Sequence, residues 1–127
     1  MYYQATIITP AQTLEIDPLI TTLQLARGQI LKIIAAFPPG PAGLLHIQIR
    51  DKGWQIAPWS LAESLAWDNY VFEMATTYSM LVEPYELTVI SWNDDDSYEH
   101  QAIVWVELAE GDPAGGGAVL QYPLQEG

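Results

Sequence analysis

The sequence predicts an all-β protein, an antiparallel β-sandwich of about eight strands in a jelly-roll-like order. Three observations lead to this prediction: short runs rich in Ile, Val, Thr, Tyr and Trp recur along the chain, Gly, Pro, Asn and Asp interrupt them, and only one segment has helical spacing. Many short strands with frequent turns favour two packed sheets. An immunoglobulin-like order is the alternative.

The predicted strands follow from these runs and from the alternation of residue types. Leu45, Ile47 and Ile49 alternate with polar residues, which is the period-two pattern of a strand with one solvated face. Leu19, Thr21 and Leu23 repeat the rhythm. The eight predicted strands cover residues 2–9, 19–25, 29–37, 44–50, 53–57, 70–76, 86–92 and 99–108.

Residues that favour turns lie between several of the predicted strands and are expected to form their connections. Arg27-Gly28 predicts a tight hairpin between the second and third strands, with Gly28 at positive φ. Asp51-Lys52-Gly53 predicts another between the fourth and fifth. Residues 37–43 contain three prolines, which cannot donate to a sheet ladder, so this segment predicts a rigid connection between sheets.

One helix and one arm complete the predicted organisation. Ser60 and Glu63 have the spacing of a capping box, and Leu61 and Leu65 follow at i, i+4, so a short helix is expected near 61–67. Residues 111–117 are rich in glycine and precede an apolar patch. We therefore expect a β-sandwich domain at 1–110 and a Gly-linked C-terminal arm at 111–127.

Charge restricts the classes of partner. The net charge is −12, and residues 53–127 carry 13 of the 16 acids and no Lys or Arg. Such a surface repels phosphate, so we expect binding neither to nucleic acid nor to an anionic membrane. Because the chain has no cysteine, disulfides, Cys-ligated metals and thiol catalysis are excluded.

No pattern in the sequence specifies catalysis, a cofactor or a metal. A G-x-S-x-G elbow, a phosphate-binding glycine loop and H-E-x-x-H are all missing. Asn93 to Asp96 could offer oxygen ligands to calcium, but their spacing favours a solvated turn between the last two strands. His46 and His100 could form a metal pair only if the fold brought them together. We expect a non-enzymatic protein without cofactor or metal.

The aromatic content supports an alternative function. Five tryptophans and seven tyrosines are many for this size, and most are expected to fill the core. Exposed aromatic faces stack on sugar rings in carbohydrate-binding modules. The alternative is therefore a sugar-binding or receptor-binding module that uses Trp54, Trp59, Trp67 and Trp92.

The last predicted strand is apolar on both faces, from Ala102 to Val106. In a small sandwich, a strand covered on both sides needs another layer, which a neighbouring subunit can supply. The runs from Tyr2 to Ile8 and from Ile30 to Ala36 show a weaker excess of the same kind. We therefore expect a homo-oligomer, with an interface formed by Tyr2, Tyr3, Ile103, Trp105, Val119, Leu120, Tyr122 and Leu124.

Six short segments carry a resemblance to a known group of proteins. They are residues 8–11 (ITPA), 37–44 (FPPGPAGL), 47–50 (IQIR), 55–59 (QIAPW), 84–88 (PYELT) and 92–95 (WNDD). In its pattern of turns and strands, the chain from about residue 5 to 108 resembles small all-β proteins encoded among the structural genes of tailed bacteriophages.

The resemblance implies a virion structural protein, namely a capsid decoration or cement protein that binds and stabilises neighbouring shell subunits. It further implies a homotrimer that contacts the major capsid protein or another virion protein, and a location in the virion after assembly in the host cytoplasm. It implies no catalytic residues. The expected helix at Ser60 to Trp67 and the arm after Glu110 depart from the family's pattern.

Overall fold

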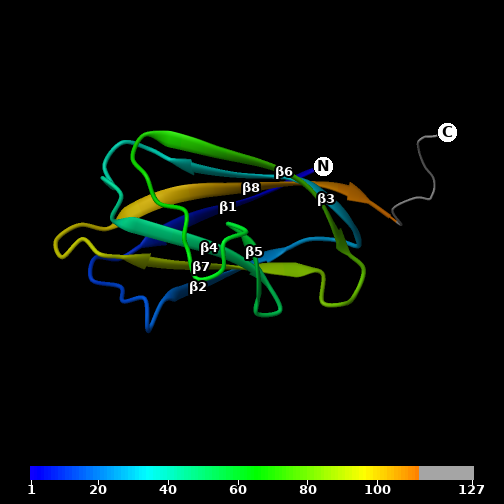
Figure 1. Ribbon diagram of the computed structural model, residues 1–127, viewed down its shortest axis with the longest axis horizontal. Helices are drawn as coiled ribbons and strands as arrows, with labels where there is room; N and C mark the ends of the chain where they lie inside the picture. The colour runs from blue at the N-terminus through cyan, green and yellow to red at the C-terminus, as the bar shows by residue number, and fades with distance from the viewer. Residues whose placement is uncertain (112–127) are drawn as a thin grey trace.

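The computed structural model describes residues 1–111 and places them in two four-stranded antiparallel sheets (Figure 1). Sheet A contains, in spatial order, β1 (Tyr2–Thr9), β8 (His100–Glu110), β3 (Gly28–Phe37) and β6 (Tyr70–Met80). Sheet B contains β2 (Leu19–Gln24), β7 (Glu86–Asn93), β4 (Leu45–Asp51) and β5 (Trp54–Ala57). The predicted β-sandwich of eight strands is confirmed.

The strands pair in the nested order of a jelly roll. β1 pairs with β8, β2 with β7, β3 with β6 and β4 with β5, all antiparallel. The chain is thus a long two-stranded ribbon with its turn between β4 and β5. Rolling the ribbon up adds the β3–β8 and β4–β7 pairings, which gives the jelly-roll-like order that the sequence predicts.

The core lies between the sheets because every second residue of each strand points inward. One buried apolar cluster joins both sheets, with the largest contributions from β3 and β8 in sheet A and from β4 in sheet B. Its fully buried large side chains are Phe37, Ile7, Ile30, Leu45, Ile47, Ile49, Met80, Leu87, Leu108, Val89, Val104 and Val106. The inner face of sheet A is therefore already filled.

Two of the predicted connections are confirmed. Lys52 and Gly53 have φ values of 51° and 85°, and Asp51 lies opposite Trp54, so they close the β4–β5 hairpin. The proline-rich segment after Phe37 connects β3 in sheet A to β4 in sheet B. A carboxylate oxygen of Asp68 accepts hydrogen bonds from the backbone N–H groups of residues 40 and 42 in this segment, at 2.8 and 2.9 Å.

The predicted hairpin at Arg27-Gly28 is wrong, because β2 and β3 lie in different sheets. Gly28 is buried at the start of β3, and its φ is not in the left-handed region. A Cβ atom there would lie 2.3 Å from the carbonyl oxygen of Ala109 on β8. Glycine is needed at this position because a neighbouring backbone passes close by, not because the chain turns.

The predicted helix near 61–67 is also wrong, since residues 1–111 contain no helix and hence none long enough to cross a membrane. Leu65 instead pairs with Ile47 through two backbone hydrogen bonds of 2.8 and 2.9 Å, and Ala62 has a φ of 69°. The side chain of Gln55 accepts from the N–H of Ala62. Its amide donates to the backbone carbonyls of Pro58, Ser60 and Glu63. These bonds hold the segment as a loop.

Candidate interaction surface

The outward-pointing residues of β8, β3 and β6 align across sheet A, on what we call its outer face. Ala36 lies opposite Ile103 on β8 and opposite Val71 on β6, so these three residues form an apolar row. Ile34 and Trp105 stand beside each other in the next row. Val71 is 52% exposed, and the other four are half-buried. The outer face thus presents apolar side chains although the core lies on the opposite side.

Charged residues border the apolar part of this outer face. Lys32 lies opposite Glu107 on β8, and its Nζ is 3.9 Å from Oε1 of Glu73 on β6. Such a solvated pair adds little stability, but it fixes where the apolar surface ends. On the β1 side, Trp105 donates its indole N–H to Oε1 of Gln4 at 2.9 Å.

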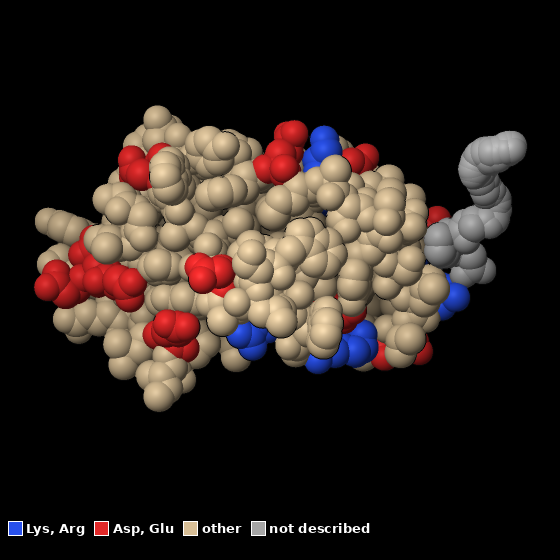
Figure 2. Space-filling model, viewed as in Figure 1, with Lys and Arg blue, Asp and Glu red and all other residues tan. Residues whose placement is uncertain are grey.

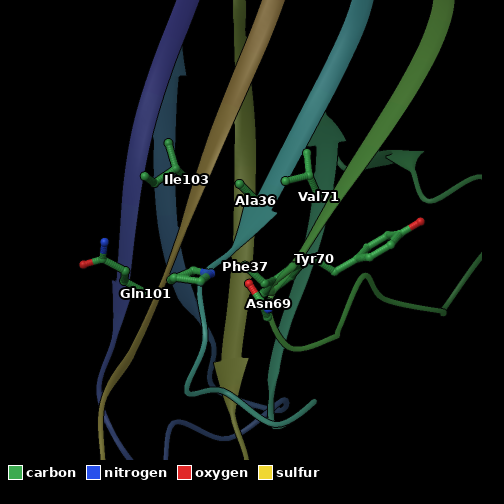
Figure 3. Close-up of a pocket in the computed structure, with 8 residues that line it drawn as sticks. Ala36, Phe37, Asn69, Tyr70, Val71, Gln101 and Ile103 are labelled. Carbon is green, nitrogen blue, oxygen red and sulfur yellow. The ribbon is translucent and has the colours of Figure 1, made fainter.

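A shallow hollow of about 510 Å³ lies where β3 ends and β6 begins (Figure 3). In Figure 3, Ile103, Ala36 and Val71 lie on three neighbouring strands, while the ring of Tyr70 extends away from them. The residues that line the hollow are Ala36, Phe37, Pro38, Asn69, Tyr70, Val71, Gln101 and Ile103. Most of these residues are apolar and two carry amide side chains, Asn69 and Gln101, a combination that suits a partner with an apolar protrusion.

Aromatic rings support the β6 side of the hollow. Phe72 contacts Phe37 edge-to-face, with ring centroids 5.9 Å apart, and Tyr70 contacts Phe72 at 4.9 Å. Trp67 adds a further edge-to-face contact to Tyr70 at 6.3 Å. Edge-to-face packing is a preferred geometry for aromatic pairs. The stack thus connects the core, through Phe37, to the surface, where Trp67 is 59% exposed.

Acidic side chains gather at one end of the molecule, where the loop between β7 and β8 lies (Figures 1 and 2). In this loop, Oδ1 of Asp95 accepts from the N–H groups of Ser97 and Tyr98 at 2.8 and 3.2 Å. Oδ2 of Asp95 is 2.8 Å from Nε2 of His100. The bond from the Ser97 N–H, followed by that to His100, lowers the pKa of Asp95 below its ordinary value.

The same loop is fixed by Asn93, whose Oδ1 accepts from the N–H of Asp95 at 3.0 Å. Its Nδ2 donates to the carbonyl oxygens of Thr9 and Tyr98. Asn93 and Asp95 therefore hold a turn by bonding its backbone. Within residues 1–111, no group of three or more His, Cys, Asp and Glu side chains could hold a metal ion.

Each histidine bonds a different acid. His46 Nε2 is 2.9 Å from Oδ2 of Asp94, its Nδ1 is 2.8 Å from Oγ of Ser64, and its ring stacks on Trp92 with centroids 5.1 Å apart. Ser, His and Asp also form hydrolytic triads, but there the carboxylate is buried. Here the carboxylate of Asp94 is 56% exposed, unlike that of a triad. The two hydrogen bonds of His46 connect the loops that contain Ser64 and Asp94 to β4. Sequence analysis missed it because no local motif links residues 46, 64 and 94.

The predicted interface residues divide into three groups. Tyr2, Ile103 and Trp105 share the outer face of sheet A. Tyr3 points the other way and packs against the core, and its hydroxyl donates to Oε2 of Glu110 at 2.6 Å, a bond that raises the pKa of Tyr3. The remaining predicted residues lie outside the described part of the chain; they are Val119, Leu120, Tyr122 and Leu124.

Three residues that line the hollow are not among the predicted interface residues: Ala36, which the sequence marks only as the end of an apolar run, and Tyr70 and Val71. A signal was present for two of them, because Tyr70, Val71 and Phe72 are three consecutive large apolar residues in one predicted strand. A strand with a single buried face needs only every second one.

The four tryptophans of the sugar-binding alternative do not lie together. Trp54 begins β5, Trp59 lies in the loop after it, and Trp67 precedes β6; all three are exposed. Trp92 is only 5% exposed and stacks on His46, so it cannot present a face to a ligand. Trp67 and Tyr70 meet at 62°, so they form no flat platform.

The described residues thus present an apolar outer face with a hollow, a set of separate exposed indoles, and an acidic end. Neither a scan against protein-family models nor a search of the curated proteins finds a match to this chain.

Proposed function

We propose that this chain is a non-enzymatic structural protein that binds protein subunits through the outer face of sheet A. The observation that carries the proposal is the apolar row of Ile103, Ala36 and Val71. The other face of this sheet already packs the core, so an isolated sandwich has no need of apolar side chains here. A partner that covers the row would bury apolar side chains that the fold leaves accessible, and this burial would stabilise the complex.

We further propose that the partner is the shell of a tailed-phage head, on which the protein acts as a decoration or cement protein. The sequence resemblance motivates this role, and jelly rolls are common in viral capsid domains. Fold alone does not fix function, so the surface must support it. The apolar part of the outer face is bordered by three charged residues, Lys32, Glu73 and Glu107. Their charges would set the orientation of a bound shell subunit.

The role requires that a tailed-phage genome encodes the chain, and particles purified from that phage would test it. The proposal expects the protein in those particles at a copy number tied to the symmetry of the shell. A cryo-EM map should place it on the head with the outer face of sheet A against the capsid. Particles that lack the protein would contradict the role.

Two charge substitutions test the binding face. Val71→Glu puts a carboxylate into the apolar row, and Thr22→Glu puts the same charge on the exposed outer face of sheet B. Loss of a central contact costs about 2 kcal/mol or more, which is roughly 30-fold in affinity. We expect this decrease in affinity for Val71→Glu, and unchanged affinity for Thr22→Glu, in co-sedimentation with phage particles from which the protein has been removed. Equal binding by both variants would contradict the assignment of the face.

The exposed indoles favour a second candidate, a sugar-binding or receptor-binding module. Tyr70 lines the hollow and contacts Trp67 edge-to-face, and each of the two offers an exposed ring. Titration with oligosaccharides, followed by tryptophan fluorescence, tests this candidate. Binding that Trp67→Ala abolishes and that Trp92→Phe retains would support it, because Trp92 is buried. Absence of any saturable signal counts against it.

A further inference from the structure

The two edge strands of sheet A, β1 and β6, differ in how they are protected against pairing with another chain. Edge strands in soluble proteins usually carry charges, prolines or bulges that prevent such pairing. β6 contains Glu73, and its ladder with β3 shifts register between Ile30 and Lys32. β1 has no charged residue and no proline, and all of its residues from Tyr2 to Thr9 pair with β8 without a shift. β1 is therefore an unprotected edge.

The hydrogen bonds at Met1 show which backbone groups of β1 are free. Met1 and Leu108 exchange two backbone bonds, with N···O distances of 3.1 and 2.8 Å. In an antiparallel ladder, bonded and non-bonded pairs alternate. Tyr3, Ala5, Ile7 and Thr9 therefore bond to β8. The open edge presents the N–H and C=O groups of four residues, Tyr2, Gln4, Thr6 and Ile8.

Those same four residues also have exposed side chains, all on the outer face of sheet A. Within residues 1–111, no recorded hydrogen bond uses their outward backbone groups. Every second residue of β1 thus offers both a free backbone donor and acceptor and an accessible side chain. This is the arrangement that adds a further strand to a sheet.

We infer that β1 pairs antiparallel with β1 of a second copy, across a two-fold axis at Ala5, and joins two copies of sheet A into one continuous sheet. The inference rests on the proposed function and specifies its self-association. In this register Tyr2 lies opposite Ile8 of the partner copy, and Gln4 lies opposite Thr6. It is the register that pairs all four open residues. Four pairs with two bonds each give about eight backbone hydrogen bonds.

The side chains suit this register. Tyr2 against Ile8 is an aromatic and β-branched pair, which is favourable across antiparallel strands. The carbonyl of the Gln4 amide accepts from Trp105, so its NH₂ group remains to donate to the hydroxyl of Thr6. Ala5 sits at the axis, where the two Cα atoms approach to about 4.5 Å and a small side chain fits.

Charge also favours this edge for a second copy. Each chain has a net charge of −12, so two copies repel over most of their surfaces. Residues 1–14 carry no charged side chain, and β1 lies within them. Two copies that meet here bring no like-charged side chains of β1 together, and more distant charges are screened beyond about 8–10 Å in salt. The two-fold arrangement differs from the trimer that the family resemblance implies.

The axis stands perpendicular to the joined sheet, because paired residues of β1 lie on the same face. Both apolar rows, with Ile103, Ala36 and Val71 in each copy, then face the same side. A surface that engages both copies at once gains from the high effective concentration of the second site. Self-pairing through β1 therefore strengthens the binding that the proposed function requires.

Single cysteines test the register, because the natural chain has none. Ala5→Cys places two thiols across the axis with Cα atoms about 4.5 Å apart, within the usual span of a disulfide. Under oxidising conditions we expect most of this variant to migrate as a covalent dimer. Ile8→Cys is the control, since each Ile8 lies about 20 Å from its own counterpart, six residues along the strand. It should stay monomeric alone and cross-link when mixed with Tyr2→Cys.

Absence of cross-linking in Ala5→Cys, or equal cross-linking in Ile8→Cys alone, would overturn the register. Light scattering after size exclusion tests the association without a disulfide: the unmodified chain should have the mass of a dimer. Thr6→Pro removes an N–H that faces the open edge and none that bonds to β8, so it should have the mass of a monomer with an unchanged circular dichroism spectrum. Thr6→Lys gives a second variant that keeps the N–H and adds an edge charge.

A monomeric or trimeric mass for the unmodified chain would overturn the two-fold pairing. The outcome can be separated from that of the proposed function. A Thr6→Pro monomer that still binds phage particles, together with a monomeric unmodified chain, leaves the proposed function standing without the pairing. A β1-linked dimer that is absent from phage particles would support the pairing and contradict the proposed function.

Discussion

Replacing Gly28 with alanine tests how closely β8 passes the start of β3. A Cβ atom at residue 28 would lie 2.3 Å from the carbonyl oxygen of Ala109 and 2.9 Å from Cα of Glu110. Both are backbone atoms and cannot rotate away, so one of the two strands has to shift. Overpacking of this kind costs about 1–3 kcal/mol in the free energy of unfolding.

The size of the change in melting temperature follows from the size of the domain. Unfolding entropy is about 2.1 cal/mol/K per residue, which gives roughly 0.23 kcal/mol/K for the 111 residues that the structure describes. The cost of about 1–3 kcal/mol therefore lowers the melting temperature of Gly28→Ala by about 4–13 °C. Thermal unfolding followed by circular dichroism measures this shift directly.

Asparagine distinguishes a close backbone contact from a turn. At a left-handed position asparagine is tolerated better than alanine, whereas near a fixed backbone the larger side chain is worse. We expect Gly28→Asn to melt below Gly28→Ala. At Gly53, which has a φ of 85° and where an added Cβ would meet no atom within 4 Å, the order should reverse. If Gly28→Asn melts above Gly28→Ala, the close-contact explanation is refuted.

Three further predictions concern stability and ionisation. Asp95→Asn should destabilise the fold above about pH 4, and the difference should vanish as the pH falls through the lowered pKa of Asp95 (ordinary value 3.8), as urea denaturation at several pH values would show. Phe37→Ala, at a residue only 2% exposed, should lower the free energy of unfolding in urea by about 3–5 kcal/mol. Burial, and then the bond from its hydroxyl to Asp51, raises the pKa of Tyr78 to about 12. The fold should thus lose stability as the pH rises from about 10 to about 12, and Tyr78→Phe should reduce that loss, as urea denaturation across this range would show.

Local chemistry was enough to predict the strands and one hairpin. Leu45, Ile47 and Ile49 are buried on β4 as their alternation predicts, but the opposite face is not solvated: Gln48 is only 2% exposed and donates a hydrogen bond to the carbonyl of Glu63 in the loop that covers it. Lys52-Gly53 was predictable because its two residues can adopt positive φ and because the flanking strands are neighbours in the sheet. The hairpin at Arg27-Gly28 failed on the second condition, since the winding of the ribbon sends β2 and β3 to different sheets.

The helix prediction failed because a capping box depends on one short-range spacing. Its contribution is about 1 kcal/mol, and Gln55 outweighs it with four hydrogen bonds to the loop. Ile103 and Trp105 could be singled out because β8 is apolar on both faces. Ala36 and Val71 could not be joined to them, since the row depends on the register of three strands that are distant in sequence. For Trp92, the sequence cannot show that loops and His46 cover an outward-facing ring.

The pairing of β1 with β8 has a consequence for synthesis of the protein. Tyr2 pairs with Glu107, so the first strand has no partner in the sheet until more than a hundred residues have been translated. At about 5–20 residues per second, that interval lasts several seconds or more. Sheets built from such distant pairs also form slowly, in milliseconds to seconds. A ribosome-bound chain that stops short of β8 exposes two apolar strands, β1 and β3, and these are natural sites for chaperone binding during translation.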